Sequence, residues 1–201
     1  MKSGRPPNAS VFPRYTHHAD RIQKTLQRRR RDIVQWALNT ERTSPVEVEG
    51  QGEFPKDNLR DVLQRFEVRY RYASGIELIY TDAGRPFVRV EGSEGWIENT
   101  WFKRDGFIAS DEALLPWKPG PNDVTLPLIS EKQDFVNSVK SRKETLIPAE
   151  VGHCTASMCQ IGHIAIETGA RLKWKPESGR FVGNDEANKL LTRAHRAPCT
   201  I

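Results

Sequence analysis

The sequence has no apolar run approaching the roughly 18 to 20 residues that a membrane-spanning helix needs. The residues after Met1 are basic and proline-rich, so they do not form the apolar core of a signal peptide either. Cysteine is scarce as well: three cysteines cannot all pair, and Cys154 and Cys159 lie close together in a helix-like stretch. We therefore expect a soluble protein of the reducing cytoplasm that neither crosses nor binds a membrane.

The rest of the composition is that of a globular protein. Of the 201 residues, 37% are hydrophobic and 28% are charged, with 14 glycines, 13 prolines and five tryptophans. These proportions exclude collagen-like, coiled-coil and wholly disordered chains. The length suits one packed domain better than two.

Positive charge is concentrated at the N-terminus. Residues 1–31 contain nine Lys and Arg against one acidic residue, a net charge of +8, whereas residues 32–201 have a net charge of −3. We therefore expect a loosely ordered or divergent basic arm over 1–31 and a folded domain over 32–201. The run Arg28 to Arg31 could neutralise phosphates. No aromatic stacking ladder, zinc finger or helix-turn-helix pattern accompanies it, so we do not expect nucleic acid as a partner.

The first half of the sequence predicts one helix and then strands. Residues 20–39 have a helical pattern that ends before Pro45. The hydrophobic period then changes to two, over residues 46–54, 66–72, 76–80, 87–90 and 96–97, with turns near Gly75 and Gly92. Alternation of this kind predicts an antiparallel sheet with one apolar face.

The second half predicts a loop and then helices. Residues 103–129 are rich in Pro and Gly and are expected to form a long surface loop. Ser130 can cap a helix to about Ser141, and a longer helix over 150–168 is expected to stop at Gly169. The first of these helices should bury Phe135, Val136 and Val139. Residues 172–174 suit a short strand, and Asn184 or Asp185 can cap a last helix that contains Ala187, Leu190 and Leu191. Strands followed by helices predict an α+β fold, a mostly antiparallel open sheet with helices packed on one face.

Three motifs invite a chemical interpretation, and each has a simpler explanation. Residues 50–55 (GQGEFP) begin like a dinucleotide fingerprint, but Pro55 stands where the third glycine belongs. His153, Cys154, Cys159 and His163 are metal-binding residue types, yet Cys154 lies about 140° around the helix from Cys159, so the four do not converge. The histidines of His17-His18-Ala19-Asp20 have no nucleophile motif beside them. We predict no catalytic residue, no cofactor-binding residue and no metal ligand in this chain.

Several segments resemble one family over most of the chain. Residues 32–38 (DIVQWAL) and 45–55 (PVEVEGQGEFP), followed in the same order by 135–143 (FVNSVKSRK), 148–153 (PAEVGH), 181–191 (FVGNDEANKLL) and 196–198 (RAP), resemble the second half of bacterial Gfo/Idh/MocA-type oxidoreductases. The resemblance implies a C-terminal α+β domain that lines a substrate site and often builds oligomers through its open sheet. In the complete family architecture this domain follows a Rossmann domain that binds NAD or NADP.

The resemblance also locates where the family's catalytic motif, Asp-x-x-x-His, would lie. With Asp32 as the anchor, the aspartate position falls on Thr25 and the histidine position on Arg29, and arginine stays charged and cannot act as a base. Using His17-His18-Ala19-Asp20 instead would need about twelve extra residues before the Trp36 helix, so we regard it as a decoy. The family's Glu-Lys-Pro motif is also missing. We therefore expect the C-terminal substrate-binding and oligomerisation part of an NAD(P)-dependent sugar- or cyclitol-type dehydrogenase, inactive alone.

The resemblance implies three candidates for a substrate pocket: Asp32 and Trp36 in the helix, and His153 at the start of the long helix. Each has a structural alternative, since Asp32 can pair with the neighbouring arginines, Trp36 can belong to the core and His153 can be a helix-start hydrogen bonder. The rival hypothesis is a stand-alone binding or assembly module that pairs with itself or with a full-length relative, for which an uncovered apolar sheet face would provide the contact.

Overall fold

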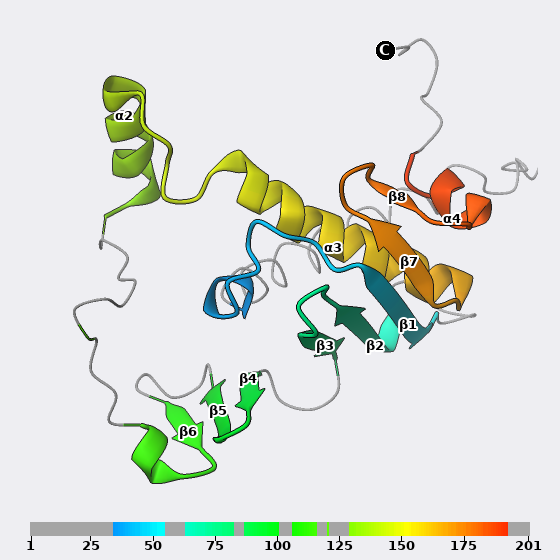
Figure 1. Ribbon diagram of the computed structural model, residues 1–201, viewed down its shortest axis with the longest axis horizontal. Coiled ribbons are helices and arrows are strands. Elements are labelled where there is room, and N and C mark those ends of the chain that lie inside the picture. The colour runs from blue at the N-terminus through cyan, green and yellow to red at the C-terminus, as the bar shows by residue number, and fades with distance from the viewer. Residues whose placement is uncertain are drawn as a thin grey trace, which may run out of the picture. The chain divides into compact units, whose positions relative to one another are not determined.

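The computed structural model describes residues 34–54, 63–82, 87–100, 106–115, 120 and 129–192 (Figure 1). These residues belong to two compact units, one formed by residues up to 83 together with those from 153 onward, and one formed by residues 84–152. The basic arm and the ends of the chain lie outside the described residues. The fold is α+β with antiparallel strand pairing, as the sequence predicts.

The first unit is built on a five-stranded sheet in the order β3-β2-β1-β7-β8. Its strands are β1 (Glu47–Glu53), β2 (Gln64–Arg71), β3 (Glu77–Thr81), β7 (Leu172–Lys175) and β8 (Arg180–Phe181). The long helix α3 (Ala149–Thr168) runs along one face of this sheet (Figure 1), and the short helix α4 (Asp185–Lys189) follows β8. The short strand expected at 172–174 is therefore confirmed, and it pairs directly with β1.

Strand alternation explains the core between the sheet and α3. Val48, Val68 and Tyr70 are almost fully buried and pack with Met158 and Ile161 of the helix. The helix approaches so closely that a Cβ at Gly162 would lie 2.1 Å from the Tyr70 hydroxyl. The apolar sheet face predicted from the sequence is this helix-covered face.

The predicted helix boundaries agree with the structure where it describes them, except that α4 ends at Lys189, so the expectation that the last helix contains Leu190 and Leu191 is wrong. Residues 34–37 are helical, and the chain leaves the helix at Asn39, which adopts a positive φ of 53°. Helix α3 ends at Thr168 and is followed by Gly169 with φ 61°, a conformation that favours glycine. Asn184 caps α4 by accepting a hydrogen bond from the Ala187 amide, as expected.

The second unit has a three-stranded sheet in the order β4-β5-β6. Strands β4 (Phe87–Gly92) and β5 (Gly95–Thr100) form the hairpin predicted at Gly92, and β6 (Phe107–Ala109) is followed by the 3-10 turn η1 (Glu112–Leu114). The expectation of a continuous loop over 103–129 is therefore wrong for residues 107–114. Three residues are too few to show a period of two, and their pairing with β5 is what makes them a strand.

Helix α2 (Glu131–Ser141) begins at the predicted Ser130 cap, whose side chain accepts a hydrogen bond from the Gln133 amide. The prediction that it buries its apolar residues is wrong: Phe135, Val136 and Val139 are 63%, 42% and 49% exposed. The cap and the end at Arg142, which has φ 59°, are local features, so the helix forms without a core against its apolar side. Within the described part of the chain, no helix is both long and apolar enough to cross a membrane.

Candidate functional site

The face of the five-stranded sheet away from α3 is charged. Residues that alternate with the buried Val48, Tyr70 and Leu78 point to this side, because successive side chains of a strand lie on opposite faces. We call it the open face, and its central residues are Glu47 and Glu49 of β1, Arg69 and Arg71 of β2, and Glu77 of β3. The open face also contains Ile79 of β3, which is 51% exposed, but most apolar residues of the sheet are buried under α3. The extended apolar uncovered face considered from the sequence is therefore wrong for this unit.

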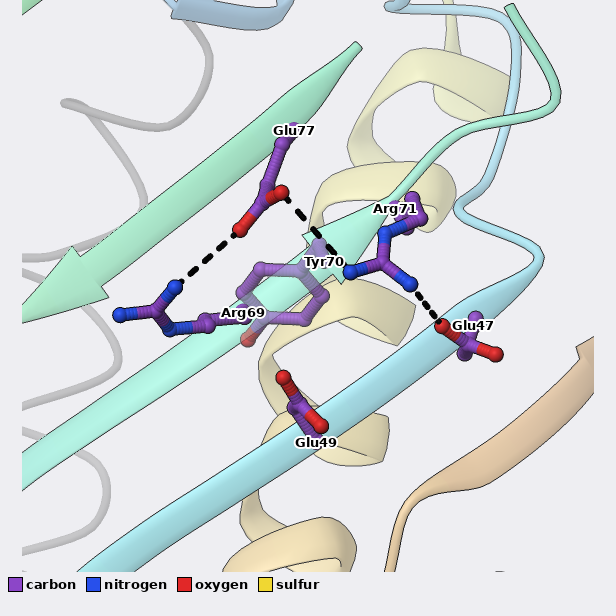
Figure 2. Close-up of a pocket in the computed structure, with 6 residues that line it drawn as sticks. All are labelled: Glu47, Glu49, Arg69, Tyr70, Arg71 and Glu77. Carbon is purple, nitrogen blue, oxygen red and sulfur yellow. Dashed lines mark hydrogen bonds and ion pairs between the residues drawn. The ribbon is translucent and has the colours of Figure 1, made fainter. Parts of the chain in front are cut away.

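The open-face charges form ion pairs between neighbouring strands. Figure 2 shows Arg71 between two carboxylates, with Nη1 2.7 Å from Glu47 Oε1 and Nη2 3.9 Å from Glu77 Oε2. Arg69 Nη1 lies 3.5 Å from the other oxygen of Glu77. A third guanidinium, that of Arg171, donates a hydrogen bond to Glu47 from the loop before β7. Four segments of the chain thus meet through these side chains.

The cations around Glu47 change its acidity. The hydrogen bond from Arg171 lowers the pKa of Glu47, and the positive charges of Arg171, Arg71 and Lys173 act in the same direction, while partial burial opposes them. Glu47 raises the pKa of Arg171 in return. Both groups are therefore charged throughout the physiological pH range.

The lowered pKa of Glu47 predicts a pH dependence of stability. A carboxylate with a lower pKa in the folded state stabilises that state fully above its ordinary pKa, and this contribution disappears as the pH falls through the lower folded value. We expect Glu47→Gln to reduce the urea midpoint of unfolding slightly at pH 7 and not at all below the folded pKa. Equal effects at both pH values would show that the charge of Glu47 contributes nothing to the stability of the fold. Glu53→Gln, at the end of the same strand, is the control.

The five open-face residues named above, together with Tyr70, line a shallow depression that encloses no space large enough for a water molecule. It is open to solvent, and its functional groups are carboxylates and guanidiniums rather than a nucleophile beside a base. This geometry suits recognition of a complementary charged surface better than enclosure of a small substrate.

Comparison with protein families identifies the chain. The family model described as "Oxidoreductase family, C-terminal alpha/beta domain" matches residues 24–201. The chain belongs to the Gfo/Idh/MocA oxidoreductase family. The match confirms the resemblance and extends it N-terminally, so it includes Thr25 and Arg29. Comparisons with curated proteins and with solved structures gave no match.

The family implies NAD or NADP, and the glycines that resemble a dinucleotide fingerprint do not fit that cofactor. Gly50 and Gly52 lie within β1, where a Cβ would be 2.8 Å and 3.2 Å from side-chain atoms of Ile166. They permit close packing of α3 against the sheet, whereas a phosphate cradle needs glycines at a strand-to-helix turn. This agrees with a match to the C-terminal domain of the Gfo/Idh/MocA family rather than to a nucleotide-binding domain.

Of the three substrate-pocket candidates in this Gfo/Idh/MocA domain, the structure places two. Trp36 is 44% exposed in the helical residues 34–37, so the alternative of a core tryptophan is wrong. His153 is exposed in α3, and its Nε2 lies 3.4 Å from the hydroxyl of Ser157 one turn later. Asp32, like Thr25, Arg29 and the motif at His17-His18, lies outside the described residues.

Sequence reasoning missed a buried polar residue next to Trp36, namely Gln35. Its side chain is fully buried, its Oε1 accepts a hydrogen bond from Thr155 Oγ1 at 2.8 Å, and its Nε2 donates to Met158 Sδ at 2.8 Å. The Gln35–Thr155 bond joins the helical segment that contains Trp36 to the part of α3 that contains His153. The sequence did show a glutamine among the apolar residues of a helix, which could have suggested a buried polar contact. Its partner, Thr155, lies far along the chain and could not be identified from the sequence.

The Cys and His residues of α3 do not gather into a metal site. Cys154 and Cys159 are buried, His153 is exposed, and His163 lies partly exposed beside Glu167 and the ring of Phe54. Among the residues described by the structure, no group of three or more His, Cys, Asp or Glu side chains is arranged to hold a metal ion. Cys199 lies outside them.

Proposed function

We propose that this chain is the substrate-binding and oligomerisation part of an NAD(P)-dependent sugar- or cyclitol-type dehydrogenase, and that it does not transfer hydride on its own. The match of residues 24–201 to the C-terminal domain of an oxidoreductase family supports this proposal most strongly. The predicted boundary between a basic arm and the folded domain at residues 31 and 32 is part of the proposal, as is a cytoplasmic location.

The residues at the family's catalytic positions support inactivity. Hydride transfer from a sugar alcohol needs a base for the hydroxyl proton while nicotinamide takes the hydride. Thr25 has no carboxylate to orient such a base, and Arg29 holds its proton at any neutral pH. Both positions lie within the region that the family model matches.

The substrate would contact the segments that contain Trp36 and His153. A half-exposed tryptophan offers an apolar ring face, and an exposed histidine offers a hydrogen-bonding nitrogen, which are the groups that sugar rings and hydroxyls need. The buried hydrogen bond between Gln35 and Thr155 holds the two segments together. A small polyol is therefore the proposed ligand class.

An activity assay tests the proposal. The purified chain, incubated with NAD+ or NADP+ and a panel of cyclitols and aldoses, should form no NADH or NADPH, whereas a complete bacterial member of the family should do so in the same assay. Stoichiometric cofactor reduction by the chain alone would overturn the proposed inactivity.

A binding experiment tests the substrate role separately. Saturation-transfer NMR with the same polyols should show weak binding that Trp36→Ala and His153→Ala reduce. Trp96→Ala, in the other compact unit, is the matched control and should leave binding unchanged. Absence of any polyol signal, or equal loss in all three variants, would contradict the assigned residues.

The second candidate function is a stand-alone assembly module, and the charged open face favours it. Ion-paired residues over four neighbouring segments offer a surface for another protein chain without any need for a cofactor. A full-length relative and a second copy of the chain are the partners considered.

A further inference from the structure

A buried glutamine connects three segments of the first unit. The side-chain oxygen of Gln35 accepts a hydrogen bond from Thr155 Oγ1 of α3 at 2.8 Å. Its side-chain nitrogen lies 2.8 Å from Met158 Sδ, about one turn later in the same helix, and 3.4 Å from the hydroxyl of Tyr72, which directly follows β2. All four side chains are buried. The helical residues 34–37, α3 and the end of β2 therefore meet at the amide group of Gln35.

The backbone of Gln35 is held as well. Its carbonyl oxygen accepts hydrogen bonds from the amide of Thr40 at 2.7 Å and from Thr40 Oγ1 at 3.3 Å, where the chain leaves the helix. Thr40 is itself buried. Because buried partners hold both the side chain and the backbone of Gln35, this turn of helix has little freedom to rotate against α3.

Trp36 is the next residue of this helical turn. Successive side chains of a helix point about 100° apart, so the buried side chain of Gln35 fixes the direction in which Trp36 leaves the turn. Trp36 points away from the core and is 44% exposed. Within the described part of the chain, no hydrogen bond or aromatic contact holds its indole ring. The orientation of the ring therefore depends on the orientation of the turn.

Thr155 makes the corresponding link from α3. It follows His153 by two positions, and it is fully buried whereas His153 is exposed. The bond from Thr155 to Gln35 thus joins the turn that carries Trp36 to the turn of α3 that carries His153. A buried hydrogen bond has a defined length and direction, so it fixes the relative position of two helices more narrowly than apolar contacts do.

We propose that Gln35 is the positioning residue of the polyol site formed by the segments of Trp36 and His153: through Thr155 it fixes the orientation of Trp36 without touching the ligand. The inference rests on the proposed function and deepens it, because it names the residue that orders the apolar ring of the site. A side chain held in place before binding loses less conformational freedom when the ligand arrives. Loss of the link should therefore weaken polyol binding even in a variant that stays folded.

Two substitutions of Thr155 test the link with little change in volume. Valine has nearly the shape of threonine but no hydroxyl, so Thr155→Val removes the donor to Gln35, whereas Thr155→Ser keeps it. Thr155 is a better site for this test than Gln35, because Gln35→Ala also leaves a cavity. Circular dichroism and urea unfolding check that both variants are folded under the assay conditions.

Fluorine NMR of the chain labelled with fluorotryptophan reports the surroundings of Trp36 without any ligand. Trp36→Phe assigns the resonance by its disappearance. Thr155→Val should shift or split the Trp36 resonance, and Thr155→Ser should return it close to its original position. The resonance of Trp96, in the other compact unit, should stay unchanged in both variants. An unshifted Trp36 resonance in Thr155→Val would overturn the proposal.

Chemical-shift titration with myo-inositol, a cyclitol, measures the effect on binding. We expect Thr155→Val to bind about fivefold more weakly than the unmodified chain, and Thr155→Ser to stay within about twofold of it. Phe181→Leu is the control for general destabilisation, because Phe181 is buried on β8 and packs edge-on against Trp174 of β7. It should destabilise the fold and shift the Trp174 resonance, yet leave the affinity and the Trp36 resonance unchanged.

The outcomes distinguish the positioning role from the proposed function. If the unmodified chain binds neither myo-inositol nor any other polyol of the panel, the proposed substrate role fails, whatever the fluorine spectra show. If the unmodified chain binds myo-inositol and Thr155→Val binds it equally well, the positioning role of Gln35 fails while the substrate role stands. An equal loss of affinity in Phe181→Leu and Thr155→Val would also overturn the positioning role, because affinity would then follow stability alone.

Discussion

We expect Gly162→Ala to lower the free energy of unfolding by about 2 kcal/mol, because overpacked sites of this kind typically cost 1 to 3 kcal/mol. The new methyl group would lie 2.1 Å from the Tyr70 hydroxyl and 3.0 Å from Cζ of the same ring. Tyr70 cannot move aside cheaply, since it is fully buried and its hydroxyl donates a hydrogen bond to the Met158 carbonyl at 3.0 Å. Helix α3 would have to shift away from the sheet.

Gly152→Ala is the matched control for this prediction. It makes the same substitution in the same helix, but a Cβ at Gly152 meets no atom within 4 Å. The better helix propensity of alanine should leave this variant unchanged or stabilise it by up to about 1 kcal/mol. Urea unfolding followed by circular dichroism measures both. Equal stabilities of the two variants would contradict the close approach of α3 to β2.

The sequence was sufficient for the elements whose signal is local. Period-two alternation located β1 to β5, and the Ser130 cap and Gly169 marked helix boundaries, because each depends on residues within a few positions. The same reasoning identified Gly50 and Gly52 only as flexible positions of a strand. Their role is to let α3 pack closely against β1. That role depends on Ile166 of α3, which meets β1 only in the folded protein.

Two predictions failed because they needed contacts that a local pattern does not contain. The amphipathic pattern of α2 indicated a buried side around Phe135, but a pattern does not say whether a partner is present. Strand β6 was missed because its pairing with β5 defines it.

The charged open face was visible in part. The alternations VEVE at 46–49 and VRYR at 68–71 place like charges on one side of each strand. The ion pairs between strands, however, depend on the antiparallel register of β1 with its neighbours, and no single stretch of sequence contains that information. The open face could thus be predicted as charged, but its ion pairs could not.

The largest effect on stability is expected at Gln35, which sequence reasoning passed over in favour of its neighbour Trp36. We expect Gln35→Ala to lower the free energy of unfolding by about 3 kcal/mol, since it leaves a cavity and a buried hydroxyl without its acceptor. The hydroxyl is that of Thr155, which is fully buried and donates to Gln35 Oε1 at 2.8 Å. Met158 Sδ would keep only its contact with the Tyr72 hydroxyl, at 3.1 Å.

Gln160→Ala is the control for residue type, because Gln160 is an exposed glutamine of α3 and its replacement should change stability by no more than about 0.5 kcal/mol. A double-mutant cycle with Thr155→Val then isolates the hydrogen bond. Residues that share a buried bond couple by about 1 kcal/mol, so the double variant should be more stable than the sum of the single effects predicts. Strict additivity would mean that Gln35 and Thr155 do not interact, and that the helical segment of Trp36 is held to α3 without this hydrogen bond.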